Sequence, residues 1–169
     1  PFYQCLKMLG KRNQPTEYLT QGSFVTNLLL RITKNAQEDE IAVKRGWEPK
    51  DNESLPFRYY WIHDKDEVIV KILDNYFSAI RDTFPEEWNP QTADRFILRK
   101  TVGFQALLKA FDAIWHKSKD AQDASKEFFV NIAENYRKHL RGRPLTSEEF
   151  GSSAAQAGHL SKVLLGQAE

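Results

Sequence analysis

The apolar residues of this chain recur at helical spacing over several segments, and one segment is the most extensive. Between residues 96 and 115 one row of positions has successive spacings of four, three, four, three and four. The row consists of Ile97, Thr101, Phe104, Leu108, Phe111 and Trp115. A second, parallel row makes the apolar face wider than a coiled-coil seam. We therefore predict a central helix over residues 92–116 with neighbours on more than one side.

Gly103 lies inside this predicted helix. A glycine in a helix interior costs about 1 kcal/mol relative to alanine. A glycine at such a position often allows another backbone to come close. We predict that Gly103 packs against the helix expected over residues 69–84.

Four further segments have the pattern of helices. In the clearest one, Asp64 and Glu67 suggest a capping box, and the apolar spacing continues to Phe84 before Pro85. The other three are residues 20–35 with Thr20 as N-cap, residues 120–140, and a last helix that begins at Ser152 or Ser153. The fold class is therefore mainly α, with about five helices around the central one.

The remaining segments have no helical periodicity of comparable length. Residues 2–9 suggest a short strand or extended segment near the N-terminus, which would need a partner strand that the chain need not contain. Residues 57–62 (FRYYWI) suggest a second short extended segment, and residues 146–150 one helical turn. Residues 36–56 are polar and predict a long loop.

The composition is that of one globular domain over residues 1–169, with 41% hydrophobic and 28% charged residues. No apolar run approaches the roughly 18 residues of a membrane-spanning helix and no signal peptide is recognisable, so we expect a cytoplasmic protein with no membrane partner. Cys5 is the only cysteine, which excludes an internal disulfide and a zinc site built from cysteines. Because the chain starts at Pro1, we expect it to be the C-terminal part of a longer protein.

The net charge of +1 means that nucleic-acid binding would require a local basic patch. Such a patch is present in the run NYRKHLRGRP, and its residues are Arg137, Lys138, Arg141 and Arg143, with His139 among them. These cations could bind phosphates, and Tyr136 could stack beside a base. Alternatively, cations in the last turn of a helix stabilise its negative end without any ligand.

Other chemistry has little support in the sequence. The histidines His63, His116, His139 and His159 have no metal-binding spacing, and no nucleophile elbow, P-loop or dinucleotide fingerprint occurs. The carboxylate groups fall at helix starts and turns, where the helix dipole accounts for them. Residues 151–153 are a helix cap, and Arg99 and Lys100 are expected to reach solvent along their stems. We expect no catalytic residue, metal or cofactor in this chain.

Several segments, in this order, resemble the C-terminal half of DGQHR-domain proteins, a family that includes DndB-like regulators of DNA phosphorothioate modification. The segments are PFYQCLKML, TQGSFVTNLL, NYFSAIRDTFPEEW, ILRKTVGFQALLKAF and the terminal segment that begins with GSS. The closest pieces are residues 76–88 and 100–104. The resemblance implies a helical accessory half of a two-part bacterial or phage protein. The Asp-Gly-Gln-His-Arg motif that names the family is absent from this chain.

Three functional hypotheses follow. The first is a non-catalytic helical domain that supports DNA-modification-linked regulation, either by packing on its own N-terminal domain or by touching DNA. The second is the helical half of an enzyme whose active site lies in a preceding N-terminal part. The third is a dimerisation or protein-interaction module, in which the chain forms a homo-oligomer or binds another protein.

Overall fold

The computed structural model describes residues 6–7 and 19–169, and this part of the chain is mainly helical, as predicted. The elements are β1 (Leu6–Lys7), β2 (Leu19–Thr20), α1 (Gln21–Leu29), α2 (Ala36–Lys44), α3 (Arg58–Ile62), α4 (Asp66–Thr83), α5 (Pro85–Trp88), the 3₁₀ turn η1 (Pro90–Thr92), α6 (Thr101–Ala121), α7 (Lys126–Leu140), α8 (Ser147–Phe150) and α9 (Ala154–Leu164). All five predicted helices are present, and the helical turn predicted over residues 146–150 is α8; α2, α3, α5 and η1 are additional.

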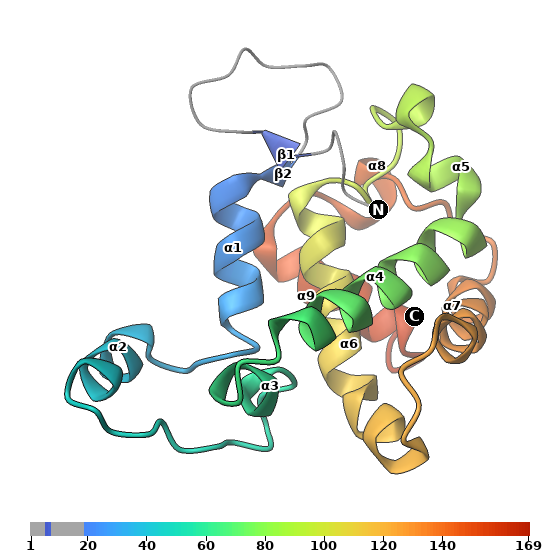
Figure 1. The fold of residues 1–169 in the computed structure, drawn as a ribbon. Helices are drawn as coiled ribbons and strands as arrows, with labels where there is room; N and C mark the ends of the chain where they lie inside the picture. The colour runs from blue at the N-terminus through green and yellow to red at the C-terminus, as the bar shows by residue number, and fades with distance from the viewer. Residues whose placement is uncertain (1–5, 8–18) are drawn as a thin grey trace.

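Helix α6 lies at the centre of the fold and contacts its neighbours on several sides (Figure 1). Its Phe111 ring lies 5.1 Å from the ring of Tyr76 on α4 and 6.1 Å from that of Phe129 on α7. Its Phe104 ring stacks on Phe24 of α1 at 5.2 Å, and α9 packs along a further side. The prediction of a central helix with several neighbours is confirmed.

The predicted start of the central helix at residue 92 is wrong, because α6 begins at Thr101. Phe96, Ile97 and Leu98 are all buried, and three consecutive residues cannot share one helix face. The segment instead crosses the start of α6, where Phe96 forms an antiparallel bridge with Thr146 and the Ile97 amide donates to the Leu145 carbonyl at 2.9 Å.

The predicted neighbour of Gly103 is also wrong. A Cβ added at Gly103 would fall 2.5 Å from the Leu98 Cα, and closer still to the Ile97 carbonyl oxygen. The backbone that approaches Gly103 is therefore the crossing segment and not α4. Aromatic side chains lie between α4 and α6, as shown by the Phe77 and Phe104 rings at 5.7 Å.

The long loop predicted over residues 36–56 is interrupted by α2. Asn35 caps this helix by accepting a hydrogen bond from the Glu38 amide at 3.3 Å. Acidic residues occupy its first turn and Lys44 its last, in accord with the helix dipole. The helix has no fully buried residue, which explains why no apolar period marks it in the sequence.

The extended segment predicted at residues 57–62 is instead the short helix α3. Aromatic residues favour strands by propensity, but a strand needs a partner to satisfy its backbone groups. In a helical turn these groups pair locally, as the Trp61 amide does with the Phe57 carbonyl at 3.0 Å.

Two of the three helix caps predicted from the sequence are confirmed. Thr20 caps α1, and Ser153 caps α9 and forms a full capping box with Gln156. Thr146, which was not predicted to be a cap, caps α8. The capping box predicted at Asp64 is wrong: Asp64 has φ of 52° and α4 begins at Asp66.

The remaining corrections concern helix ends and strands. Helix α1 ends at Leu29 and not near residue 35, and α7 begins at Lys126 because α6 continues to Ala121. Strand β1 finds its partner within the chain: it pairs in parallel with β2, with Leu6 opposite Leu19. The rest of the segment predicted as a strand, residues 2–5 and 8–9, lies outside the described residues.

We expect Gly103→Ala to lower the free energy of unfolding by about 2 kcal/mol or more. The reason is that its Cβ would overlap backbone atoms that cannot move independently. Gly103→Leu should cost more, and thermal and urea unfolding measure both. Gly22→Ala is the matched control, since a Cβ on this helical glycine of α1 meets nothing within 4 Å. An unchanged melting temperature of Gly103→Ala would contradict the close approach.

Candidate functional site

The predicted basic cluster lies at the C-terminal end of α7, but its four cations do not act together. Arg137 lies over the Phe84 ring at the end of α4, with its guanidinium carbon 5.5 Å from the ring centre. Lys138, Arg141 and Arg143 instead line one cleft of about 430 Å³, formed with residues 166–169 of the C-terminal tail. The structure therefore brings three of the four predicted residues together and separates the fourth.

Two of the three cations in this cleft have carboxylate partners. Arg143 contacts Glu149 at 2.5 Å and lies over the Phe150 ring at 4.6 Å. Arg141 contacts Glu169 at 3.3 Å. Both side chains of this second pair are exposed, and such a pair contributes little stability.

The C-terminal ends of α7 and α9, where the helix dipoles are negative, also lie at this cleft. His139, near the end of α7, donates from Nδ1 to the Leu164 carbonyl at the end of α9, at 2.7 Å. Its ring packs so closely on Gly166 that a Cβ there would fall 2.9 Å from Nε2. The C-terminal ends of α7 and α9 thus lie side by side.

The charges in this region nearly balance. Three cations face two carboxylates. The two helix ends together contribute roughly one further negative charge. The geometry therefore favours the structural explanation of the cluster, in which cations neutralise helix ends, over a strong phosphate site.

The predicted stacking role of Tyr136 is wrong, because this side chain is only 2% exposed. It points into the core between α4 and α7, where burial raises the pKa of its phenol well above the usual value. A base cannot reach its ring.

The other candidate groups have structural roles. Arg99 is 3% exposed, so the expectation that it reaches solvent is wrong; it belongs to the segment that crosses α6. His116 lies within α6 and not at its end. The acidic pairs Glu86–Glu87 and Glu148–Glu149 occupy the first turns of α5 and α8, as the helix dipole favours. Within residues 6–7 and 19–169, no group of three or more metal-ligating side chains lies close enough to hold an ion.

A surface that the sequence did not reveal is formed by α1, α2 and the loop after α2, here called the arm (residues 21–47). Helix α2 stands apart from the main helices at the end of two connecting loops (Figure 1). Among the described residues, six of the eight large hydrophobic side chains that are exposed belong to the arm. They are Val25, Leu29, Leu30, Ile41, Val43 and Trp47. An apolar groove of about 360 Å³ lies between its helices, lined by Leu29, Val43 and by Trp61 of α3.

Two buried cations attach the arm to the body: Arg31 of the arm pairs with Asp112 of α6 at 2.6 Å, and Arg58 of α3 pairs with the arm from the other side of the contact. The Arg58 guanidinium on α3 forms a two-pronged ion pair with Asp39 of α2. It also donates to the Ile32 carbonyl at 3.2 Å, and its Nε donates to the Lys50 carbonyl at 2.9 Å. A hydrogen bond from Arg58 holds the pKa of Asp39 below its usual value.

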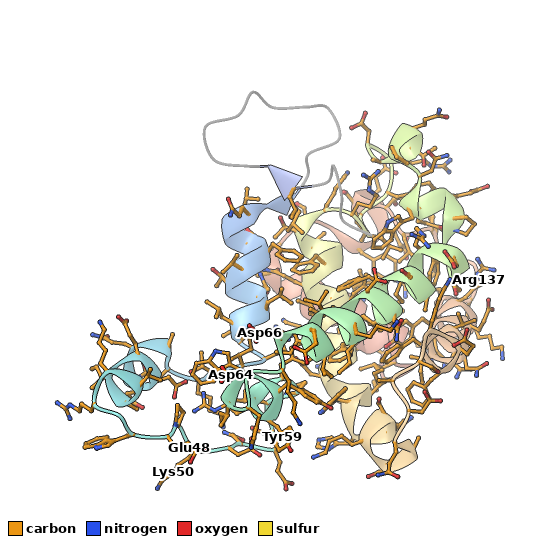
Figure 2. All side chains as sticks on the ribbon, viewed as in Figure 1. Glu48, Lys50, Tyr59, Asp64, Asp66 and Arg137 are labelled. Atoms are coloured by element: carbon orange, nitrogen blue, oxygen red, sulfur yellow. The ribbon has the colours of Figure 1, made fainter. Side chains whose placement is uncertain are left out.

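A second surface missed by the sequence lies on the other side of α3, where Tyr59 and Tyr60 meet Trp115 of α6 around a pocket. Figure 2 shows Tyr59 near the loop that carries Glu48 and Lys50, far from Arg137. The aromatic density of residues 57–62 is the signal that could have indicated it.

Comparison with family models, with curated proteins and with solved structures found no match for this chain. No helix among residues 19–169 is both long and apolar enough to span a membrane.

We expect Asp39→Asn to release α2 from the body at a cost of about 2 kcal/mol, because Arg58 would lose a charged partner. Amide hydrogen exchange should accelerate in α2 and remain unchanged in α6. Glu38→Gln is the matched control, since Glu38 is an exposed acid on the same helix. Equal exchange in both variants would contradict the anchoring role.

The same ion pair predicts a pH dependence. The folded pKa of Asp39 lies below its ordinary value of 3.8. The stabilisation is therefore complete above about pH 4 and is lost as the pH falls through the lowered pKa. The protection factors of the α2 amides, which correct for the pH dependence of intrinsic exchange, should fall below about pH 4 in the wild type. In Asp39→Asn this acid-dependent fall should be absent.

We expect the double charge reversal Arg141→Glu with Arg143→Glu to leave any DNA binding by this chain unchanged, because the cluster is already neutralised. A salt-dependent titration with a fluorescent duplex measures it. Lys71→Glu with Lys117→Glu makes the same change of net charge on exposed sites elsewhere. If only the first variant loses affinity, with a salt slope lower by about 1 for each lost phosphate contact, these arginines contact DNA.

Proposed function

We propose that this chain is a non-catalytic helical domain of a DGQHR-like protein, and that it supports DNA-modification-linked regulation by joining two copies through the arm. The observation that carries this proposal is the concentration of exposed apolar side chains on α1 and α2. Two of these side chains, Leu29 and Val43, line one apolar groove, and apolar grooves at a protein surface often mark interaction sites. The link to DNA modification rests on the resemblance of residues 76–88 and 100–104.

The occupant of the arm surface that fits best is a second copy of the same arm. Along α2 the acidic residues Glu38 and Glu40 come first, and Lys44 and Arg45 come last. Two such helices related by a two-fold axis perpendicular to them run antiparallel, so the acidic half of each faces the basic half of the other. The intrahelical pair of Glu40 and Lys44 is exposed on both sides and is weak enough to be exchanged across an interface.

Direct contact between DNA and Lys138, Arg141 and Arg143 is the second candidate. The observation that favours it is the shared cleft of these three cations. We rank direct DNA contact second because the charges at the ends of α7 and α9 nearly balance.

We expect the chain to sediment as a dimer, and Val43→Glu to weaken the dimer by about tenfold or more, because it places a charge at an apolar contact. Sedimentation velocity over a concentration series measures this. Val70→Glu is the matched control, since Val70 is an exposed valine on α4 outside the arm.

The charge pattern gives a second test of the same interface. Lys44→Glu should weaken the dimer, and Lys44→Glu combined with Glu40→Lys should restore it, because the swap re-establishes opposite charges across the two-fold axis. A wild-type chain that is monomeric at every concentration contradicts self-association through the arm.

A further inference from the structure

A pocket of about 430 Å³ lies beside α3, between the loop that precedes this helix and the last turns of α6. Its aromatic lining is Tyr59 and Tyr60 from α3 and Trp115 from α6. Asp51 and Glu53 from the loop and Lys119 from α6 supply its charged groups. None of these residues belongs to the arm or to the basic cluster.

The three aromatic rings form adjacent walls and not a stack. The rings of Tyr59 and Tyr60 have centres 5.6 Å apart and planes at 84°, and those of Tyr60 and Trp115 are 6.4 Å apart at 75°. The exposed fraction falls from 46% at Tyr59 to 5% at Trp115, so the pocket passes from an open rim to a buried floor.

The pocket is suited to positive charge. Aromatic ring faces are electron-rich and attract cations within about 6 Å of the ring centre. The Tyr59 ring already has the Lys65 ammonium 5.5 Å from its centre, and the His63 ring packs on it at 4.3 Å, so the more enclosed rings of Tyr60 and Trp115 supply most of the free aromatic surface. The lining also contains the carboxylates of Asp51 and Glu53, whose charges balance those of Lys119 and of Lys65 beside Tyr59. Burial raises the pKa of Tyr60, so its phenol stays neutral over the physiological range.

The walls are held in place by contacts behind the pocket. Trp115 packs on Phe111 at 5.5 Å and on Phe57 at 6.2 Å, so its indole is fixed in the core. The loop is fixed by Asn52, whose Oδ1 accepts from the Ser54 amide at 3.0 Å, and by the hydrogen bond from Arg58 to the Lys50 carbonyl. A pocket that is already formed loses little entropy when a ligand binds.

We propose that the pocket formed by Tyr59, Tyr60 and Trp115, with Asp51 and Glu53 at its edge, binds a methylated ammonium group. The methyl groups of such an ammonium share its positive charge and can contact the ring faces directly. They donate no hydrogen bonds that the aromatic walls would have to accept. A primary ammonium would lose hydration that three rings cannot replace. Two sources supply such a group: a small quaternary amine or a methylated lysine of a protein.

The test titrates the full chain with choline and, separately, with 3,3-dimethyl-1-butanol, which has the same shape without the charge. Nuclear magnetic resonance follows the Trp115 indole and Tyr60 ring signals, with sodium chloride at matched ionic strength as a control. We expect choline to shift these signals and to bind about threefold to thirtyfold more tightly than the neutral alcohol. Equal binding of the two compounds, or no shift at these rings, would overturn the proposal.

Variants locate the binding to this pocket. Tyr60→Leu and Glu53→Gln should each weaken choline binding, whereas Lys119→Gln should strengthen it by removing the competing positive charge. Trp47→Leu, which removes an exposed aromatic ring on the arm, should have no effect. Glu53 is exposed, so its variant retains the fold even if Tyr60→Leu does not. Unchanged binding in Glu53→Gln and Tyr60→Leu alike would show that the cation binds elsewhere.

A peptide that carries trimethyllysine, compared with the same peptide without the methyl groups, distinguishes a protein source of the methylated ammonium group from a small amine. Tighter binding of the modified peptide than of choline indicates a protein partner, and the reverse indicates a small amine; both results support the proposed chemistry. Preference for the unmodified lysine peptide would contradict it.

Discussion

The burial of α6 on several sides is the constraint on which the rest of this structure depends. A helix that is surrounded needs apolar residues around most of its circumference and at least one point where the chain can pass close to its axis. Gly103 is that point, because the absence of a side chain admits the Ile97 carbonyl. The crossing segment then reaches Leu145 and Thr146, and so connects the start of α6 to the entry of α8.

A second constraint acts at the periphery, where Arg58 is 6% exposed. A buried guanidinium needs hydrogen-bond acceptors for all of its N–H groups. Here they come from α2, from the turn after α1 and from the loop at Lys50. The arm and the loop beside the aromatic pocket are thereby fixed to the same short helix. The two surfaces proposed to bind partners therefore share Arg58 as an anchor, although they face different ligands.

The fold was more predictable from the sequence than the candidate sites. The periodicity of residues 69–84 indicated a helix correctly, and Thr20 and Ser153 indicated helix caps correctly, because these depend on local spacing and local hydrogen bonds. Helix α2 was missed because it buries no residue completely. The basic cluster was recognised as a run of charges, but the run could not show that Arg137 packs on Phe84 while Arg143 pairs with Glu149.

The sequence by itself determined that this protein is mainly helical, that its central helix includes residues 101–116, and that Thr20 and Ser153 cap helices, since each of these follows from patterns within a few helical turns. The tertiary structure alone decided which backbone approaches Gly103, that α7 and α9 end side by side, and that Tyr59 and Tyr60 meet Trp115. These contacts join separate elements of the chain, and no local spacing encodes them. The apolar face of α6 can therefore be predicted from the sequence alone. That Trp115 on this helix forms the floor of a pocket is decided only by the tertiary structure.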